Sequence, residues 1–368
     1  MDKIFNLFGS IKRNLRLKKI DLNFPKVEFP EEIKKENKEK KVLFLVPFGD
    51  WLFHHQVDAV VASALRLRGT DVCIVRCDGI YKDCSIITKG YLLGSFYITL
   101  MENVYRVFRD KDYRLKEFCK KCSAVGDHFF SKFKLPFIQM SHYLKNEDYQ
   151  EAYKWVNSLK DTDYYEAVYD GLQLGRWVTS SVYTFLRISS RGLNRADARE
   201  VHKQYLINGF LTYKALSRIY DEYKPTNTVI FNARIYPYRI AFELARMNNI
   251  PVVVHERGLT DDTFLLYENN TCISPEPILN IADVWKDIAL SKETLVKVKQ
   301  YLYDLENGIE YTSRYFFIRS NDYLYARKKL NIPADKKLLG LFTSSEFELD
   351  DAHTPFCQLD LIDKLIEI

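Results

Sequence analysis

Four cysteines have the spacing of a metal site. Cys77 and Cys84 follow a predicted strand, and the stretch "CKKC" supplies Cys119 and Cys122. Two pairs of thiolates suit a tetrahedral zinc ion ahead of an iron–sulfur cluster, and four protein ligands would leave no position for a substrate. We therefore predict a structural metal site, with separate, partly buried cysteines as the alternative. We expect these cysteines to lie away from the ligand-binding edge of the sheet.

A second set of ionisable residues follows a buried strand. The stretch "IPVVVHERG" (250–258) begins with apolar residues and ends in His255, Glu256, Arg257 and Gly258. In a parallel α/β sheet, ligands bind beyond the carboxyl ends of the strands. The valines would therefore lie in the sheet and the three ionisable side chains would emerge at its edge, where Gly258 allows a sharp turn.

Polar residues follow other predicted strands and would reach the same edge. Acids, arginines and histidines gathered there predict a binding or catalytic site, and ordinary salt bridges at the rim are the alternative. The residues concerned are Gly49, Asp50, His54, His55, Asn232 and Arg234.

The elements that must position these residues follow from hydrophobic patterning. Short apolar runs predict buried strands, and a longer amphipathic stretch closed by Gly69 predicts a helix between the first two. The result is an α/β fold with a Rossmann-like parallel sheet. The predicted strands lie within 41–48, 70–77, 227–233 and 250–254, the helices within 50–69 and 237–249, and a large helical insertion spans about 85–222.

The last part of the chain predicts the start of a second Rossmann-like domain. The run "KLLGLFTSS" reads as a strand and "QLDLIDKLIEI" as a helix, and this pair cannot bury its own apolar faces. We therefore expect an incomplete second domain. The predicted division is 1–40 for an N-terminal helix and linker, 41–330 for the first domain and 331–368 for the start of the second.

The composition argues against a nucleic-acid-binding, a membrane-spanning or a secreted protein. The 368 residues are 47% hydrophobic and carry a net charge of +5, too small a surplus to indicate nucleic acid. No apolar run reaches the roughly 20 residues of a membrane span, and no signal peptide is evident, so we expect a cytoplasmic protein. The basic amphipathic start has Ile4, Phe8, Ile11 and Leu15 at helical spacing. It predicts either attachment to an anionic membrane surface or docking on the protein itself.

Three stretches resemble bacterial glycosyltransferases of the GT-B type that build capsules and surface polysaccharides. They are "TVIFNARIYPYRIAFELARMNNIPVVVHERG", "YDGLQLGRWVTSSVYTFLR" and "LNIPADKKLLGLFTSSEFE", and the resemblance covers about residues 41–350. In that group a strand ends in Asn-Gly-Arg and the next ends in Glu-Arg-Gly. Ala233 stands here in place of the middle glycine.

The resemblance implies two Rossmann-like domains, the first for an acceptor and the second for a nucleotide-sugar. Asp50 would be the general base of an inverting reaction, followed by Glu256 and His55 as further candidates. Arg234 and Arg257 would orient a phosphate, carboxylate or sugar through their forked donors. The remaining implied contacts are His54, His255, Asn232, Gly49 and Gly258 toward the substrate, and Ser344, Ser345 and Glu346 toward the donor.

The leading hypothesis is therefore a glycosyltransferase that extends a surface polysaccharide or lipid-linked acceptor, peripherally at the inner face of the membrane. One alternative is a transferase of another nucleotide-activated group, such as glycerol phosphate. A second is a non-catalytic protein that binds polysaccharide during assembly, and a third is a metal-sensing or redox protein built on the cysteines. No phosphate-binding P-loop, zinc-protease or nucleophile-elbow motif occurs.

Overall fold

The computed structural model describes residues 14, 17–23, 37–49, 51–81, 84, 111–160, 162–258, 263–307 and 325–333. The chain divides into two compact units. The first contains the described residues up to His255 together with Leu266–Ile273, and the second contains Glu256–Leu265 and the described residues from Ser274 onward. The first unit holds the elements that position the candidate site.

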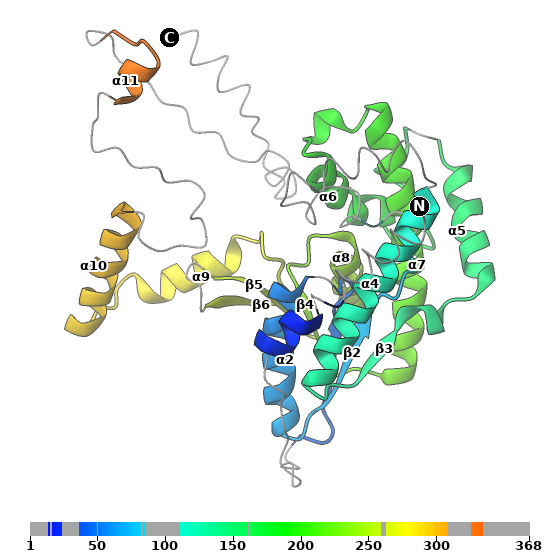
Figure 1. Cartoon of the computed structure of the whole chain (residues 1–368), viewed down its shortest axis with the longest axis horizontal. Coiled ribbons are helices and arrows are strands. Elements are labelled where there is room, and N and C mark those ends of the chain that lie inside the picture. Colours follow the sequence, from blue (N-terminus) through cyan, green and yellow to red (C-terminus); the bar gives the residue numbers. More distant parts are fainter. Residues whose placement is uncertain are drawn as a thin grey trace. The chain divides into compact units, whose positions relative to one another are not determined.

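A mostly parallel sheet forms the centre of the fold, which confirms the predicted α/β class. Its strands lie in the order β3-β2-β1-β4-β5-β6 (Figure 1). The first five give the order 3-2-1-4-5, which is that of the doubly wound Rossmann folds. The strands are β1 (Lys41–Leu45), β2 (Asp71–Arg76), β3 (Phe137–Gln139), β4 (Asn227–Phe231), β5 (Val252–Arg257) and β6 (Phe264–Glu268).

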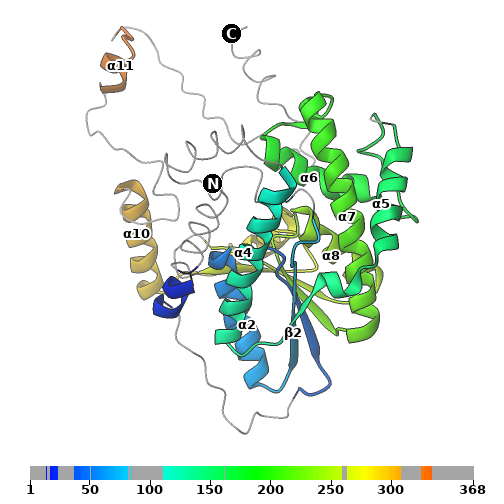
Figure 2. The same cartoon turned by 45° about the vertical axis from the view of Figure 1, so that its right-hand side comes forward.

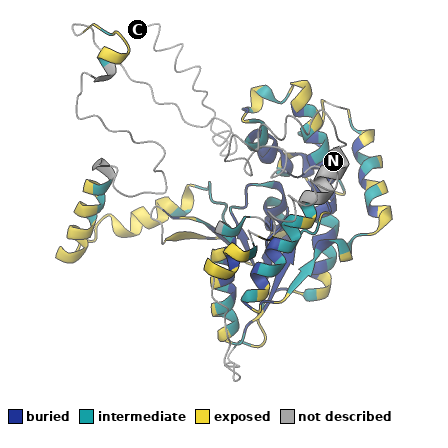
Figure 3. Ribbon diagram, viewed as in Figure 1, coloured by how far each residue is buried: buried dark blue, intermediate teal, exposed yellow. Residues whose placement is uncertain are grey.

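Apolar side chains fill both faces of the sheet, because successive residues of a strand point to opposite sides. In β1, Phe44 joins one buried cluster, whereas Leu43 and Leu45 join the other. The register sets Phe44 beside Ile74 of β2 and beside Val229 of β4. Figure 3 shows this buried interior between layers of helices with exposed outer faces.

Helices cover the two faces of the sheet. Helices α2 and α4 lie on one side, and α5 to α8 lie on the other, as Figures 1 and 2 show from two directions. In the first unit the bounds are α2 (Leu52–Leu67), α4 (Lys111–Lys132), α5 (Asn146–Ser158), α6 (Leu174–Leu186), α7 (Ala196–Tyr223) and α8 (Tyr236–Met247), with short 3-10 turns η1 (Met140–Tyr143) and η2 (Ser190–Gly192). The second unit contains α9 (Glu276–Trp285), α10 (Lys292–Asn307) and α11 (Tyr325–Lys329).

Local sequence signals explain where two of these helices begin and end. Helix α2 stops at Leu67 and is followed by Gly69 with φ +87°, a left-handed conformation that glycine adopts without strain. Helix α8 carries Pro237 in its first turn, where the missing N–H of proline costs no helical hydrogen bond. Both helices match their predicted ranges closely.

The strands depart from the predictions in three places. Strand β3 lies inside the segment expected to be helical, so α4 and β3 complete a second parallel crossover beside β2. Strand β5 continues through His255, Glu256 and Arg257, which were expected to follow it. The continuation pairs with β6, an unpredicted antiparallel strand, through bonds from Gly258 N to Thr263 O (2.9 Å) and from Asn269 N to Val252 O (2.8 Å).

The N-terminal segment docks on the first unit over the residues that the structure describes. Ile20 is 1% exposed within the cluster under α2 and α4. Asp21 Oδ1 lies 2.8 Å from His128 Nε2 and 3.1 Å from Lys132 Nζ, both on α4. The predicted apolar positions Ile4, Phe8, Ile11 and Leu15 lie outside the described residues. No helix within the described ranges is long and apolar enough to cross a membrane.

Candidate functional site at the strand-order reversal

The candidate site lies at the carboxyl ends of β1 and β4. These strands are neighbours, and the chain proceeds outward from β1 to β2 on one side and from β4 to β5 on the other. Such a reversal leaves a crevice beyond the strand ends because the following helices turn to opposite faces of the sheet. Gly49 and Trp51 follow β1 here, and Asn232 and Arg234 follow β4. The structure therefore brings together the two loops that the sequence predicted to meet.

The loop after β4 contains a left-handed turn. Asn232 has φ +64° and Ala233 has φ +57°, and neither is a glycine. Left-handed backbone costs about 1–2 kcal/mol for a residue with a Cβ, less for asparagine. Two hydrogen bonds hold the turn, from Asn232 N to His255 O (2.9 Å) and from Arg234 N to Asn232 Oδ1 (3.0 Å). Ala233, which stands where the resembling group has a glycine, thus adopts a left-handed conformation that favours glycine.

Side chains of helix α6 hold this turn through hydrogen bonds. Ser181 Oγ accepts a hydrogen bond from Tyr236 N (2.7 Å) and so satisfies a donor at the start of α8. Thr184 Oγ1 accepts one from Arg234 Nη2 (3.1 Å), which fixes the guanidinium of a residue that is only 8% exposed. The sequence did not indicate Thr184, because nothing local marks one threonine of a helix as the partner of an arginine 50 residues later.

Aromatic rings pack against one another at the same edge of the sheet. The His54 ring lies 3.8 Å from that of Phe231, measured between ring centroids, and 4.9 Å from that of Trp51. Phe48 lies 5.3 Å from Trp51, and Tyr238 lies 5.6 Å from Phe231. Trp51 and His54 are half-buried. Aromatic faces of this kind suit the stacking of a sugar ring.

A buried pair ties β5 to α2 beneath the edge. His255 Nε2 lies 2.9 Å from Asp58 Oδ1, and the two side chains are 2% and 3% exposed. The ring of His255 was expected to contact substrate, but it is occupied by this bond and covered by protein. Asp58 was not predicted, although it lies one turn after His54 as a lone acid within an apolar helix. The pair positions the strand end.

His55 lies on the other side of α2. Its ring is 1% exposed and packs 5.9 Å from Phe129 and 5.4 Å from Phe130, measured between centroids. Burial, and to a lesser degree the charge of Arg76, lowers the pKa of His55 well below its usual value. The Phe48 carbonyl lies near the ring but outside hydrogen-bond geometry. The structure therefore places His55 in the core between α2 and α4.

The four predicted metal-binding cysteines line one cavity of about 20 Å³. Pro47 and Phe48, from the end of β1, line it as well. The cysteines therefore lie at the carboxyl edge of the sheet, and the expectation that they lie away from it is wrong. The loop after β2 folds back over the strand end, which a linear sequence does not reveal. Burial raises the pKa of the Cys77 and Cys119 thiols to about 12.

Several predicted site residues lie elsewhere or outside the described ranges. Glu256 and Arg257 belong to the second unit, where Glu256 Oε1 accepts a hydrogen bond from Arg257 N (2.8 Å) and Arg257 is exposed. Gly258 packs against Thr263, so a Cβ at this position would overlap the threonine. The predicted residues outside the described ranges are Asp50, Ser344, Ser345 and Glu346.

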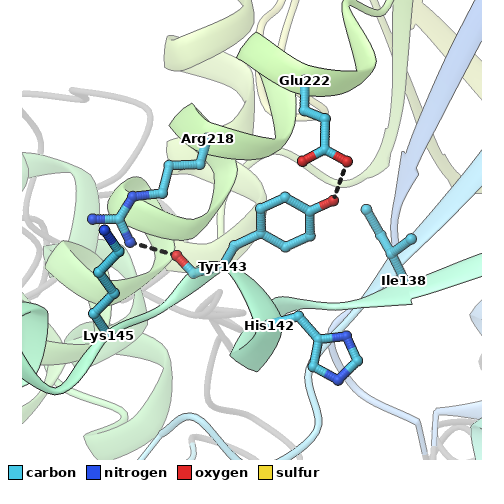
Figure 4. Close-up of a pocket in the computed structure, with 6 residues that line it drawn as sticks. All are labelled: Ile138, His142, Tyr143, Lys145, Arg218 and Glu222. Carbon is cyan, nitrogen blue, oxygen red and sulfur yellow. Dashed lines mark hydrogen bonds between the residues drawn. The ribbon is translucent and has the colours of Figure 1, made fainter.

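A larger cavity of about 410 Å³ opens beside β3, at the end of the sheet order away from β4. Figure 4 shows Tyr143 between Arg218 and Glu222 of α7, with its hydroxyl donating to Glu222 Oε1 (3.1 Å). Arg218 also donates to both carboxylate oxygens of Asp148, at 2.7 Å each. Arg218 and Glu222 thus already have partners, so the cavity offers a weaker site than the reversal point.

Comparison with known proteins supplies no family. No model of a protein family matches the chain, and no curated protein matches it. Among solved structures, that of a CDPS from Fluoribacter dumoffii matches with 13% sequence identity and a TM-score of 0.34. The match covers 66% of this chain and 96% of that chain. A similarity of this size indicates neither a family nor a function.

Proposed function

We propose that this chain is a glycosyltransferase of the GT-B type that moves a sugar from a nucleotide-sugar to a hydroxyl of a surface-polysaccharide or lipid-linked acceptor. The observation that carries the proposal is the left-handed turn at Asn232 and Ala233, located at the reversal of strand order. Backbone strain persists only where surrounding structure holds it, and it concentrates at ligand-binding sites. This is also the edge at which open α/β sheets bind ligands.

The acceptor would bind across the two loops at this edge. The half-buried rings of Trp51 and His54 would stack on a sugar ring, and Arg234 would bond a phosphate or carboxylate through its forked donors. The buried pair of His255 and Asp58 would position the end of β5 without touching the substrate. Together these groups provide one apolar face and one cationic group, as a charged glycan or a lipid-linked sugar phosphate requires.

Asp50 is the proposed general base, from its place in the sequence between Gly49 and Trp51. In an inverting transfer, its carboxylate takes the proton of the acceptor hydroxyl. The hydroxyl oxygen then forms a bond to the anomeric carbon as the bond from that carbon to the nucleotide diphosphate breaks. Glu256 is the second candidate. Ser344, Ser345 and Glu346 would contact the donor from a second Rossmann-like domain, and the basic N-terminal segment would hold the enzyme at the inner face of the membrane.

The test is acceptor-dependent release of nucleotide. The full chain is incubated with uridine-, guanosine-, thymidine- and cytidine-linked sugars and with CDP-glycerol, in the presence of oligosaccharide acceptors, and the released nucleotide is measured by chromatography. We expect release from one nucleotide-sugar, and a loss of about 10²-fold or more in the Asp50→Asn variant because general base catalysis contributes that much. Asp71→Asn is the matched control, since Asp71 is an exposed acid at the opposite end of β2.

Three results would redirect the proposal. Release from CDP-glycerol alone would assign a glycerol phosphate transferase. Thermal stabilisation by oligosaccharide without nucleotide release from any donor would assign a binding protein that assists polysaccharide assembly. Undiminished turnover in Asp50→Asn would remove Asp50 from the mechanism and leave Glu256 as the remaining candidate.

A further inference from the structure

The cavity lined by cysteines joins two segments that lie far apart in the sequence. Cys77 and Cys84 come from the loop after β2, and Cys119 and Cys122 come from α4. All four are present as thiols. Cys77, Cys119 and Cys122 are close enough to interact electrostatically with one another. A cavity of about 20 Å³ has room for about one water-sized occupant.

The backbone around the cavity is shaped for close approach. Gly79 has φ +107°, which a residue with a Cβ rarely adopts. A Cβ built at this position would lie 3.2 Å from Cys119 Cβ and 3.7 Å from Cys119 Sγ. Glycine at position 79 therefore lets the loop after β2 reach α4 and present Cys77 to the two cysteines of the helix.

A backbone donor already points at one of the sulfurs. Gly79 N donates to Cys77 Sγ across 3.4 Å. Such N–H···S bonds stabilise negative charge on sulfur, and hydrogen bonds of this kind tune the ligands of metal sites. A neutral thiol gains little from such a donor, whereas a metal-bound thiolate is stabilised by it.

A buried cation offsets the charge that such a site would carry. The Arg76 side chain is 0% exposed, is paired with Asp127, and interacts electrostatically with Cys77 and Cys122. Four thiolates around a divalent ion carry a net charge of −2, and a buried charge is costly unless a nearby group compensates it. Arg76 lies close enough to Cys77 and Cys122 to offset part of that charge, although it is also paired with Asp127.

We propose that Cys77, Cys84, Cys119 and Cys122 bind one zinc ion that pins the loop after β2 to α4. Four thiolates at about 2.3 Å form the closed tetrahedral shell of a structural zinc site. The four thiols release their protons to solvent when the metal binds. An iron–sulfur cluster is larger than the single-ion space that the cavity provides.

The side chains must rotate to complete the shell. Within the part of the chain that the structure describes, no three His, Cys, Asp or Glu side chains are already placed at coordination spacing. A change from one staggered χ1 rotamer to another moves a cysteine Sγ by roughly 3 Å, which is enough for thiols that line one small cavity.

The ion would stabilise the wall of the candidate site without taking part in the reaction. A Cβ on Gly49 would overlap the Cys122 carbonyl oxygen, so the loop after β1 and the cysteine-bearing turn of α4 are in direct contact. This proposal does not depend on the transferase activity, because a closed four-thiolate site has the same role in an enzyme and in a binding protein.

The test measures metal content and thiol protection in the full chain. Protein purified without chelators and without air is analysed for zinc and iron, and the metal-free protein is titrated with Co²⁺. We expect one zinc per chain and visible absorption bands of tetrahedral cobalt thiolate. The Cys119→Ser/Cys122→Ser variant should bind zinc at least about tenfold more weakly, since two of four ligands are lost. Cys73→Ser is the matched control, because Cys73 is a buried cysteine of β2 that does not line the cavity.

A second measurement remains informative even where a variant fails to fold. The wild-type chain is alkylated with and without a zinc chelator, and the modified peptides are identified by mass spectrometry. We expect the four cavity cysteines to react only after chelation, and Cys73 to react equally in both samples. Absence of stoichiometric metal together with unchanged protection would overturn the proposal. Iron with visible cluster absorption would overturn the assignment of zinc.

Discussion

Replacement of Gly49 by alanine should destabilise the first unit because the loop after β1 has no room for a methyl group. A Cβ at this position would overlap the Cys122 carbonyl oxygen, and it would lie 2.7 Å from Arg76 Nη2 and 2.9 Å from the Cys122 carbonyl carbon. Gly126 of α4 faces the same point, since a Cβ there would lie 2.9 Å from Gly49 Cα. The loop and the helix therefore cross where neither carries a side chain.

The size of the effect follows from which atoms must move. Carbon atoms in contact prefer separations of about 3.5–4.0 Å, so the new methyl group must be displaced by more than about 0.6 Å from the Cys122 carbonyl carbon. That carbonyl belongs to a helix, and the Arg76 guanidinium is held by Asp127 and by Ser123 O, so neither yields easily. Overpacking costs about 1–3 kcal/mol, and we expect the upper end. Alanine recovers about 0.4–1 kcal/mol by restricting the unfolded chain, which leaves a net loss of roughly 2 kcal/mol.

The assay is urea denaturation of the full chain, followed by tryptophan fluorescence. Three of the four tryptophans, Trp51, Trp155 and Trp177, lie in the first unit. We expect a lower midpoint with an unchanged slope, since the slope reflects the surface exposed on unfolding. A Gly49→Ala variant within about 0.5 kcal/mol of the wild type, the range of an ordinary surface substitution, would refute the close packing of this loop against α4.

Gly171→Ala separates packing from backbone strain. Gly171 has φ +78°, and a methyl group added there would have no atom within 4 Å, so alanine strains the backbone and meets nothing. We expect a loss of about 1 kcal/mol from this conformation alone. Because Gly49 lies outside the left-handed region, a larger loss there than at Gly171 would be due to the overlap with α4.

Two further predictions concern buried histidines. Burial lowers the pKa of His202, on α7, from 6.5 to about 4. As the pH falls, His202 is therefore protonated near pH 6.5 in the unfolded chain but only near pH 4 in the folded chain. The contribution of this group to the free energy of unfolding is complete above pH 6.5 and falls by about 3 kcal/mol as the pH drops toward 4. In the His202→Gln variant the free energy of unfolding should fall less steeply between pH 6.5 and pH 4. The same dependence on pH in the variant and the wild type would contradict this assignment. Asp58→Ala leaves His255 without its partner and should cost about 1–3 kcal/mol in urea denaturation. The exposed neighbour Gln56 serves as its control, and equal effects of Asp58→Ala and Gln56→Ala would show that the pair contributes nothing.

Local chemistry explains how much of this fold the sequence predicted. Short apolar runs determine the positions of β1, β2, β4 and β5, because a strand buried on both faces needs apolar side chains at every position. Gly69 and Pro237 mark the ends of helices through conformations available to few other residues. These signals depend on neighbours along the chain. They also predicted that polar residues would gather at one edge, since parallel strands all end on the same side.

The other features depend on contacts that no local pattern encodes. Strand β3 has three residues and lies among helices, so only pairing with β2 reveals it. The left-handed turn occurs at Asn232 and Ala233 without a glycine to mark it. His255 bonds an aspartate 197 positions away, and both side chains are buried. The spacing of the cysteines predicted a metal site from the sequence alone. The cysteines themselves lie at the carboxyl edge because the loop after β2 folds back toward the end of β1, a tertiary contact that linear spacing cannot specify.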